Sequence, residues 1–432
     1  MIKRISKYVI VFIIMLIIFL TLMVGACFIP NSAIYKNVKT SSEQLYELGE
    51  KQIIKLSKKE IVMFYFTDIL MLNISYSVDS TEPFESAILA RKNYNKDITS
   101  NIEQMGENVE ADSNYMGIYN GTAIELNDLI DNKVDESFEY ARYWHGYLIF
   151  LRPMLVLFNY SQIICIFKCI TLILIIILSV MLLKKFNLLV MNSFILSIIF
   201  TDMLYSTNCL NENLCFIISL IASIYILKKG NSIKHSGLVF FIIGIVTNFL
   251  DLLTCPILTL GYPLIFYYLV QKEIYLKQSI KQLFLISMFW GIGYITCWIT
   301  KWIIADMFYD KGIIINAIYQ IVYRTSGQDI TLIQLIYNLK KYLGYVYYII
   351  LGILFIFLIL SLIKLNKNKI MYFFIAFIPI LWLIVLKNHS TVHAFFTYKI
   401  LSVTICSIFI GISEILDKSI KKNKNDTKVL NN

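Results

Sequence analysis

Charged residues are scarce in this sequence of 432 residues, since Lys, Arg, Asp and Glu together make up only 16% of it. Soluble domains average about 25% charged and about 45–50% apolar residues, whereas 58% of the residues here are hydrophobic. This composition excludes an ordinary soluble enzyme, a disordered protein and a nucleic-acid-binding module. It predicts that the main partner of the chain is a lipid bilayer.

Motifs of cofactor chemistry are also missing. Neither GxGxxG nor GxxxxGK[ST] occurs, so no nucleotide-binding loop is indicated. None of the eight cysteines forms a CxxC pair, and the polar stretch of residues 33–145 contains no cysteine. A zinc ribbon or a disulfide framework would need the opposite distribution. The sequence therefore predicts no cofactor and no metal site.

Long apolar runs dominate what is present. They lie near residues 8–29, 161–183, 187–204, 214–227, 237–250, 256–270, 283–300, 343–363, 370–386 and 397–416. A helix of about 20 apolar residues crosses the hydrocarbon core of a bilayer. We therefore predict an all-α fold, a polytopic integral membrane bundle of about ten transmembrane helices. The first run is too long for a cleaved signal peptide and predicts a signal-anchor helix.

The charges are distributed unevenly along the chain. Residues 33–145 hold 19 of the 29 acidic residues but only 11 of the 39 basic ones. Basic residues such as Lys184 and Lys185 instead follow alternate apolar runs. Because positively charged connections stay in the cytoplasm, we predict a multi-pass plasma-membrane protein with both termini cytoplasmic and the acidic segment outside.

This topology divides the chain into four parts. They are a signal-anchor helix (1–32), an extracytoplasmic loop with interfacial helices (33–160), a transmembrane bundle (161–416) with an outer loop at 301–342, and a basic cytoplasmic tail (417–432). Apolar residues among lysines predict one interfacial helix in the first loop. These residues are Ile53, Ile54, Leu56, Ile61, Val62, Phe64 and Tyr65. Since the cytoplasmic connections are short, we expect the functional site on the outer face.

Two carboxylates of the first outer loop are candidate catalytic residues. Asp68 has apolar neighbours, where an unpaired carboxylate is costly and its pKa tends to rise. Asp79 precedes an expected helix start, which would hold its side chain near the membrane surface. Either carboxylate could act as a general base. The structural alternative for Asp79 is a helix N-cap.

Aromatic and basic residues gather before the second apolar run. Arg142, Tyr143, Trp144 and His145 follow one another there. Such side chains can stack on a sugar or bind a phosphate through charge-assisted hydrogen bonds. The alternative is an aromatic belt with a snorkelling arginine, which is common at the ends of spans. Both interpretations remain open for these four residues.

Four later residues are further candidates for substrate binding. Asp251 lies at the outer end of an apolar run, where an ionisable group is either functional or caps the next helix. Arg324 could contact a lipid phosphate, although a simple interfacial arginine is the plainer alternative. His389 and His393 are spaced to share one side of a helix. Two histidines without a carboxylate motif are a weak metal signal, so phosphate or substrate hydrogen bonding is the better interpretation.

The order of these parts resembles the GT-C superfamily of membrane glycosyltransferases, which have one N-terminal span, a long acidic outer loop and a polytopic bundle. The strings RYWHGY (142–147), LRP (151–153) and NHS (388–390) also resemble those of uncharacterised bacterial membrane proteins of this type. The resemblance implies a polyprenyl-phosphate-linked sugar as donor and an acidic residue soon after the first span. Asp68 and Asp79 come later than that, about 40 to 50 residues after the span.

From this resemblance we expect a glycosyltransferase that moves a sugar from a polyprenyl-phosphate donor to an envelope glycan or lipid acceptor on the outer face. Asp79 or Asp68 would accept the proton of the acceptor hydroxyl. Arg142, Arg324 and a histidine would hold the departing phosphate. Two alternatives stay open: a lipid-linked glycan flippase or transporter, which needs no titrating carboxylate, and a non-catalytic membrane protein of glycan assembly.

Overall fold

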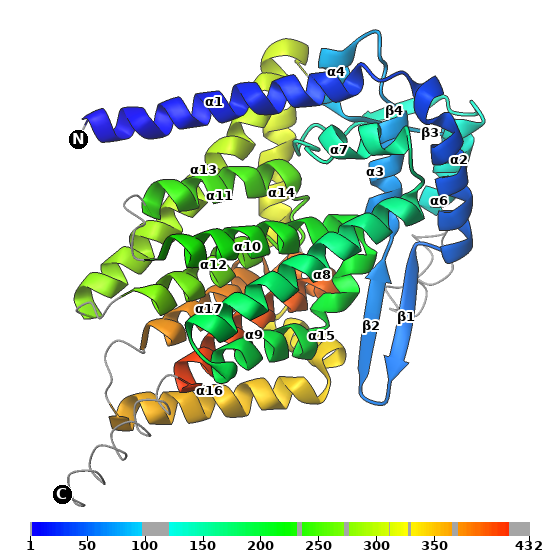
Figure 1. Cartoon of the computed structure of the whole chain (residues 1–432). Coiled ribbons are helices and arrows are strands. Elements are labelled where there is room, and N and C mark those ends of the chain that lie inside the picture. The colour runs from blue at the N-terminus through cyan, green and yellow to red at the C-terminus, as the bar shows by residue number, and fades with distance from the viewer. Residues whose placement is uncertain are drawn as a thin grey trace, which may run out of the picture.

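An N-terminal lobe lies at one end of a bundle of apolar helices (Figure 1). The structure is a computed structural model, and it describes residues 2–96, 121–230, 236–271, 276–310, 312–326, 330–364 and 370–413. We use the name N-terminal lobe for the described part of residues 31–155. The predicted basic tail, residues 417–432, lies outside the described residues.

Ten apolar helical segments of the described chain coincide with the ten predicted runs. Five of them are long and apolar enough to cross a membrane. The other five count as shorter apolar stretches, and for the segment that begins at Tyr345 this stretch is Tyr345–Phe355. In chain order they are α1 (Ile2–Cys27), α8 (Tyr160–Lys185), α9 (Leu188–Phe200), α10 (Leu210–Lys229), α11 (Ser236–Leu250), α12 (Ile257–Val270), α13 (Leu276–Tyr309), α16 (Tyr345–Lys364), α17 (Ile370–Val385) and the final segment Ala394–Ser413. A helical fold compatible with a membrane protein is thereby confirmed, while the number of spans stays a prediction.

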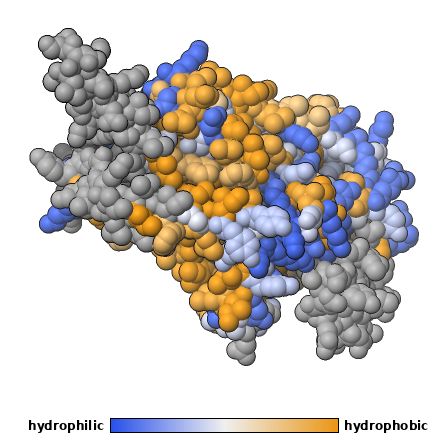
Figure 2. All heavy atoms as spheres, turned by 90° about the horizontal axis from the view of Figure 1, so that it is seen from below, coloured by the Kyte–Doolittle hydropathy of each residue, from blue (hydrophilic) through white to orange (hydrophobic). Residues whose placement is uncertain are grey.

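Figure 2 shows how polarity is divided over the surface. Apolar side chains gather over the bundle, whereas hydrophilic side chains gather toward the end of the molecule that carries the N-terminal lobe. An apolar band beside a polar lobe is the pattern expected of a helical bundle surrounded by lipid. The sidedness of the two termini stays a prediction from the charges alone.

Side-chain caps mark where two of the apolar helices begin. The Asn159 side chain accepts from the backbone N–H of Gln162 at 3.1 Å, and the Gln162 side chain accepts from the Asn159 backbone at 3.0 Å, which forms a capping box for α8. Asn187 caps α9 through its side chain in the same way. At the other end of α8, Lys185 donates to the Leu227 carbonyl of α10, which joins the two basic helix ends.

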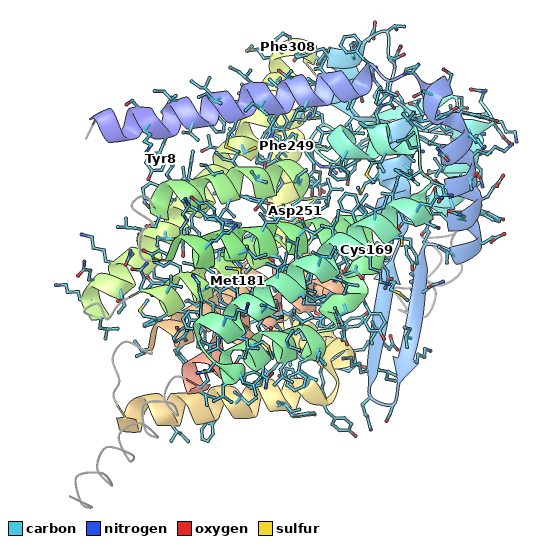
Figure 3. The ribbon with its side chains drawn as sticks, in the orientation of Figure 1. Tyr8, Cys169, Met181, Phe249, Asp251 and Phe308 are labelled. Atoms are coloured by element: carbon cyan, nitrogen blue, oxygen red, sulfur yellow. The ribbon has the colours of Figure 1, made fainter. Side chains whose placement is uncertain are left out.

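Glycines allow two of the bundle helices to approach closely. A Cβ on Gly244 of α11 would lie 2.1 Å from the Trp290 carbonyl oxygen of α13, and one on Gly293 would lie 2.2 Å from the Phe241 carbonyl oxygen. Small residues at such contacts are typical of membrane helix pairs. Tyr8 of α1 packs edge-on against Phe241, so α1 lies along this helix pair (Figure 3).

The N-terminal lobe contains strands as well as helices. Its elements are α2 (Asn31–Leu48), β1 (Lys51–Leu56), β2 (Lys59–Phe64), α3 (Phe66–Tyr76), α4 (Pro83–Leu89), β3 (Arg91–Tyr94), α6 (Gly121–Ile130), β4 (Glu136–Glu139) and α7 (Leu148–Leu155). The two sheets are antiparallel pairs, β1 with β2 and β3 with β4. The prediction that the first outer loop is helical was therefore wrong for these four strands.

The predicted interfacial helix near residues 53–65 is an antiparallel hairpin. Ile53 lies opposite Val62, and Ile54 lies opposite Ile61. These β-branched pairs fit the pleated surface of a sheet better than a helix. The prediction failed because a short apolar run broken by lysines has no decisive period.

The predicted outer loop at 301–342 is mostly helical. α13 continues through residues 301–309 to Tyr309, so the helix is longer than the apolar run 283–300. Two amphipathic helices follow, α14 (Ile313–Ser326) and α15 (Leu332–Leu343). After α17 the chain forms the short helices α18 (Lys387–Val392) and α19 (Ala394–Thr397), which bring His389 and His393 toward the lobe.

Arg152 fastens the lobe to the end of α1. This side chain is fully buried. Its Nε donates to the Ala26 carbonyl at 3.0 Å and its Nη1 to the Asn31 side chain at 3.3 Å, while the guanidinium also donates to the carbonyls of Ile29 and Ser75. Carbonyl groups at helix ends lack partners within the helix, and a single guanidinium satisfies those of α1 and α3.

Candidate functional site

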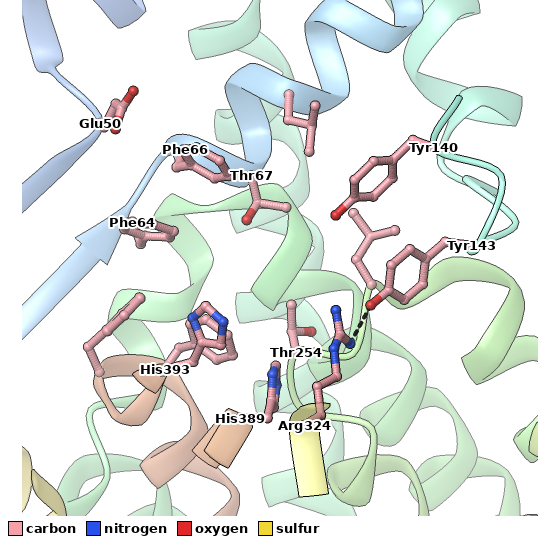
Figure 4. Close-up of a pocket in the computed structure, with 14 residues that line it drawn as sticks. Glu50, Phe64, Phe66, Thr67, Tyr140, Tyr143, Thr254, Arg324, His389 and His393 are labelled. Carbon is pink, nitrogen blue, oxygen red and sulfur yellow. Dashed lines mark hydrogen bonds between the residues drawn. The ribbon is translucent and has the colours of Figure 1, made fainter. Parts of the chain in front are cut away.

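A cavity of about 390 Å³ opens between the N-terminal lobe and the bundle (Figure 4). The lining comes from both parts of the chain: Glu50, Phe64, Phe66, Thr67, Leu70, Tyr140, Tyr143, Leu252, Thr254, Arg324, His389, His393, Phe395 and Phe396. The wall of the cavity is mostly aromatic and aliphatic. It also contains one guanidinium, two imidazoles, one carboxyl group and several hydroxyls. Concave, mostly apolar sites with a few convergent polar groups are typical of ligand binding.

Arg324 supplies the positive charge of the cavity. It lies in the last turn of α14 and is half-buried. Its Nη1 donates to the Tyr143 hydroxyl at 2.5 Å, the bond drawn dashed in Figure 4. Among the residues that the structure describes, no carboxylate pairs with this guanidinium. A half-buried guanidinium without a carboxylate partner favours an anionic ligand.

His389 and His393 face the cavity beside Arg324. Their ring centroids are 4.7 Å apart. His389 Nε2 lies 3.0 Å from the Leu253 carbonyl, so this nitrogen carries the proton and Nδ1 of the neutral ring is an acceptor. Burial lowers the pKa of His393 to about 4, with repulsion from Arg324 in addition, and it lowers the pKa of His389 well below its usual value. Both rings are therefore neutral at pH 7.

Unpaired polar atoms surround these histidines. His393 Nδ1 is a buried atom without a hydrogen-bond partner within the described chain, and the same holds for Asn388 Oδ1 and Thr391 Oγ1. The segment itself is held in place, because Asn388 donates to the Tyr323 carbonyl of α14 and Asn338 of α15 donates to the Thr391 carbonyl, each at 2.9 Å. Of these three residues, His393 lines the cavity, so its Nδ1 is available to bond a ligand there.

Glu50 provides the carboxyl group. Gly49, with φ of 73°, turns the chain from α2 into β1 and sets Glu50 at the cavity. Glu50 Oε1 accepts from the Thr122 backbone N–H at 2.8 Å and also from the Thr122 hydroxyl. Burial raises the pKa of Glu50, although the bonds from Thr122 oppose the shift. A carboxyl group with a raised pKa is a stronger base than an ordinary glutamate, which suits it to accept a proton.

Asp68 does not line the cavity. It is completely buried on α3, where it accepts from the Tyr160 hydroxyl at 2.5 Å and from the backbone N–H groups of Leu210 and Asn211 at 2.6 and 3.0 Å. The carboxyl therefore caps the first turn of α10, where a negative charge is favourable. Burial raises the pKa of Asp68 to about 6 against these hydrogen bonds.

Asp79 is exposed and lies outside the cavity lining. Its Oδ1 accepts from the backbone N–H and the hydroxyl of Thr81 at 2.8 and 2.7 Å. These bonds lower the pKa of Asp79. The side chain thus stabilises the turn before α4. The N-cap residue of α4 is Glu82, so the N-cap alternative for Asp79 was wrong.

The fold places the aromatic and basic residues 142–145 in different surroundings. Only Tyr143 lines the cavity. Arg142 bonds Asn316 at 2.7 Å, and the fully buried Trp144 donates to the Cys297 carbonyl of α13 at 2.8 Å. His145 is also buried, between the Tyr140 carbonyl and the Tyr147 hydroxyl.

Burial lowers the pKa of His145 to about 3, and its φ is 54°. The next residue, Gly146, is held tightly, because a Cβ there would lie 2.4 Å from the Phe249 carbonyl oxygen. The loop therefore docks on the end of α11 and carries Tyr143 and Tyr140 to the cavity.

Asp251 caps the turn after α11. Its carboxylate accepts from the backbone of Leu253 at 3.0 Å and from both the backbone and the hydroxyl of Thr254 at 2.8 and 2.6 Å. Asp251 is absent from the cavity lining, whereas Leu252 and Thr254 belong to it. Asp251 therefore stabilises the turn between α11 and α12. It does not cap α12, whose N-cap residue is Pro256, so the helix-capping alternative was wrong.

Comparisons with other proteins add no identification, since no known protein family, curated protein or solved structure matches this chain. Within the described residues, no group of three or more His, Cys, Asp or Glu side chains is placed to hold a metal ion. The interpretation of the cavity therefore depends on its own geometry.

Of the ten predicted site residues, the cavity brings together Tyr143, Arg324, His389 and His393. Sequence reasoning missed Glu50, Thr67, Tyr140 and Thr254. Glu50 gave a usable signal, because Gly49-Glu50 ends a polar helix directly before a strand and glycine often marks such a turn. The others are ordinary loop or helix residues that only the packing of distant segments brings to the site.

Proposed function

We propose that this protein is a membrane glycosyltransferase that moves a sugar from a polyprenyl-phosphate donor to an envelope glycan or lipid acceptor. The observation that supports it best is that Arg324 lies beside two neutral histidines and two tyrosine rings and forms no ion pair with a carboxylate of the described residues. The Arg324 guanidinium and the N–H of neutral His393 suit a phosphate, since the N–H of His389 already donates to the Leu253 carbonyl. The rings of Tyr140 and Tyr143 suit the face of a sugar.

In this proposal the acceptor hydroxyl attacks the anomeric carbon, and the bond from that carbon to the phosphate oxygen breaks. The departing phosphate takes the electron pair, and Arg324 stabilises its growing charge. Glu50 accepts the hydroxyl proton, because it is the one carboxyl group among the described residues that line the cavity. This assignment replaces Asp79 and Asp68, whose carboxylates are engaged in structural hydrogen bonds elsewhere.

The test uses the purified full-length chain in nanodiscs with a polyprenyl-phosphate-linked radiolabelled hexose. The measured quantity is the label that leaves the polyprenyl phosphate for water or for an added glycolipid. We expect Glu50→Gln to lower this rate by about 10²–10⁴-fold, the usual contribution of a general base. Arg324→Gln should lower it at least about 10-fold, since one charge-assisted hydrogen bond contributes about 1.5–3 kcal/mol.

Asp79→Asn is the matched control, because it removes an exposed carboxylate that stabilises a turn. Its rate should equal that of the wild type. A wild-type protein that binds the probe yet releases no label would refute the transferase. If in addition the intact probe crosses a vesicle membrane, the protein is a lipid-linked glycan transporter, for which Arg324, the histidines and the aromatic wall suffice.

A further inference from the structure

The two amphipathic helices beside the cavity expose apolar stripes. On α14, Ile315 is 76% exposed, and residues 318, 319 and 322 continue the stripe. On α15, Ile333 is 77% exposed, and residues 336 and 337 continue it. Spacings of three and four residues place each set on one helix face. Contiguous exposed apolar patches of this kind mark a contact with a protein or a membrane.

These stripes belong to helices that are firmly docked. The opposite face of α14 buries Ile313 and Ala317. α15 buries Leu335, Leu339 and Leu343, and it begins with a capping box. The exposed stripes are therefore a preformed surface, because each helix has a separate apolar face for its contacts with the rest of the protein.

The stripes continue the lipid-facing surface of the bundle. At the end of α13, just before α14, Met307 is 73% exposed and Phe308 is also exposed. At the start of α16, just after α15, Tyr345, Tyr348 and Ile349 are exposed. Figure 1 shows that α14 lies across the direction of the bundle helices. A helix that lies across the spans and extends their apolar surface has the geometry of an interfacial helix.

Two details favour lipid over a protein as the occupant. An apolar groove of about 240 Å³ lies between α15, α16 and α17, and leucine, isoleucine and one tyrosine line it throughout. Such a groove accepts an acyl chain. At the end of the α15 stripe, the exposed Lys340 holds its ammonium 5.2 Å above the Tyr348 ring. A cation beside an aromatic ring is typical of the headgroup region, where it meets lipid phosphates.

We infer that α14 and α15 rest in the boundary between headgroups and acyl chains of the leaflet on the cavity side. Their partner is the phospholipid surface itself, and the inference does not depend on the proposed enzymatic function. Arg324, at the end of α14, then lies close to the depth of the lipid phosphates. The cavity consequently opens at the membrane surface, where it meets ligands that are carried in the bilayer.

Depth-dependent fluorescence quenching tests this arrangement. Single cysteines replace Ile315 or Ile333 in a background with Cys165→Ser and Cys169→Ser, the two exposed cysteines of the described chain. Each protein is labelled with an environment-sensitive fluorophore and reconstituted in phosphatidylcholine vesicles. These vesicles carry a nitroxide either near the headgroup or deep in the acyl chain. We expect a larger loss of fluorescence with the shallow nitroxide than with the deep one at both positions.

Two control positions calibrate the depth. A label at Ile295, exposed in the middle of α13, should respond more strongly to the deep nitroxide. A label at Glu43, exposed on α2 of the N-terminal lobe, should respond to neither nitroxide but to aqueous iodide. Tyr319→Cys and Tyr337→Cys repeat the test if a first variant fails to fold.

Labels at Ile315 and Ile333 that behave like the one at Glu43 would overturn the inference. Cross-linking between the cysteines of two copies, without lipid quenching, would assign the surface to a dimer instead. The quenching experiment measures depth in the bilayer and does not require sugar transfer. The inference and the proposed function can therefore be refuted independently of each other.

Discussion

Replacing Asp68 with Asn distinguishes a structural carboxyl group from a catalytic one. Burial raises the pKa of Asp68 from 3.8 to about 6 in the folded protein, although three groups donate hydrogen bonds to it. Because the folded pKa exceeds the unfolded one, the folded protein binds this proton more tightly. The stability contributed by protonation is complete below about pH 4 and is lost as the pH rises through about 6.

The size of the effect follows from the shift. About two pKa units at 1.36 kcal/mol each correspond to about 3 kcal/mol between the protonated and ionised limits. On lowering the pH from 7.5 to 5, the wild type should recover about 1 kcal/mol of this amount. Asn does not titrate, so the Asp68→Asn variant should lack this gain. Asn has only one side-chain oxygen, so one backbone N–H of α10 also loses its acceptor. This loss costs about 1–3 kcal/mol.

The assay is denaturant unfolding of detergent-solubilised protein, followed by tryptophan fluorescence at pH 7.5 and pH 5. The relevant quantity is the difference in free energy of unfolding between wild type and Asp68→Asn, which should change by about 1 kcal/mol between the two pH values. Asp79→Asn is the control. Hydrogen bonds lower the pKa of Asp79, so its contribution is lost only below about pH 4 and should be constant in this range. Equal pH dependence of wild type and Asp68→Asn would refute the reasoning.

Two further predictions concern buried charges. Arg152→Met removes the guanidinium that donates to the Ala26 and Ser75 carbonyls. A buried acceptor that loses its donor costs about 1–3 kcal/mol, so the free energy of unfolding should fall by about 2–5 kcal/mol; a change below about 1 kcal/mol would contradict this role. Lys399 and Glu212 form a pair at 2.5 Å in which each side chain is 1% exposed. Lys399→Met or Glu212→Gln alone should lower the free energy of unfolding by about 3–5 kcal/mol. The double variant should lower it by clearly less than the sum of the two single effects. An additive result in the same unfolding assay would exclude coupling.

The apolar helices were predictable from the sequence because a bilayer leaves the backbone few choices. A chain in lipid must satisfy its own N–H and C=O groups, so long apolar runs form helices whatever surrounds them. α8 and α10 lie where composition alone placed them, and Asn159 even marks the start of α8 with its capping residue. Residue type also singled out Arg324, His389 and His393 as polar groups in unusual places.

The N-terminal lobe was less predictable, because it has both strands and helices. Ile53 to Tyr65 carry an apolar pattern that suits either structure. The contact of β2 with α15, including the Lys341–Glu60 ion pair at 3.1 Å, helps to hold the hairpin in place. Local pattern could not reveal a partner so far along the chain.

Which carboxylate faces the cavity was decided only by the tertiary structure. Asp68, Asp79 and Glu50 are all acidic residues of one polar segment, and the sequence by itself determined no more than that. Packing buried Asp68 against the first turn of α10, left Asp79 at an exposed turn, and set Glu50 in the same cavity as Arg324. The physical reason is that burial, hydrogen-bond partners and neighbouring charges determine what a carboxyl group can do, and all three come from residues distant in the chain.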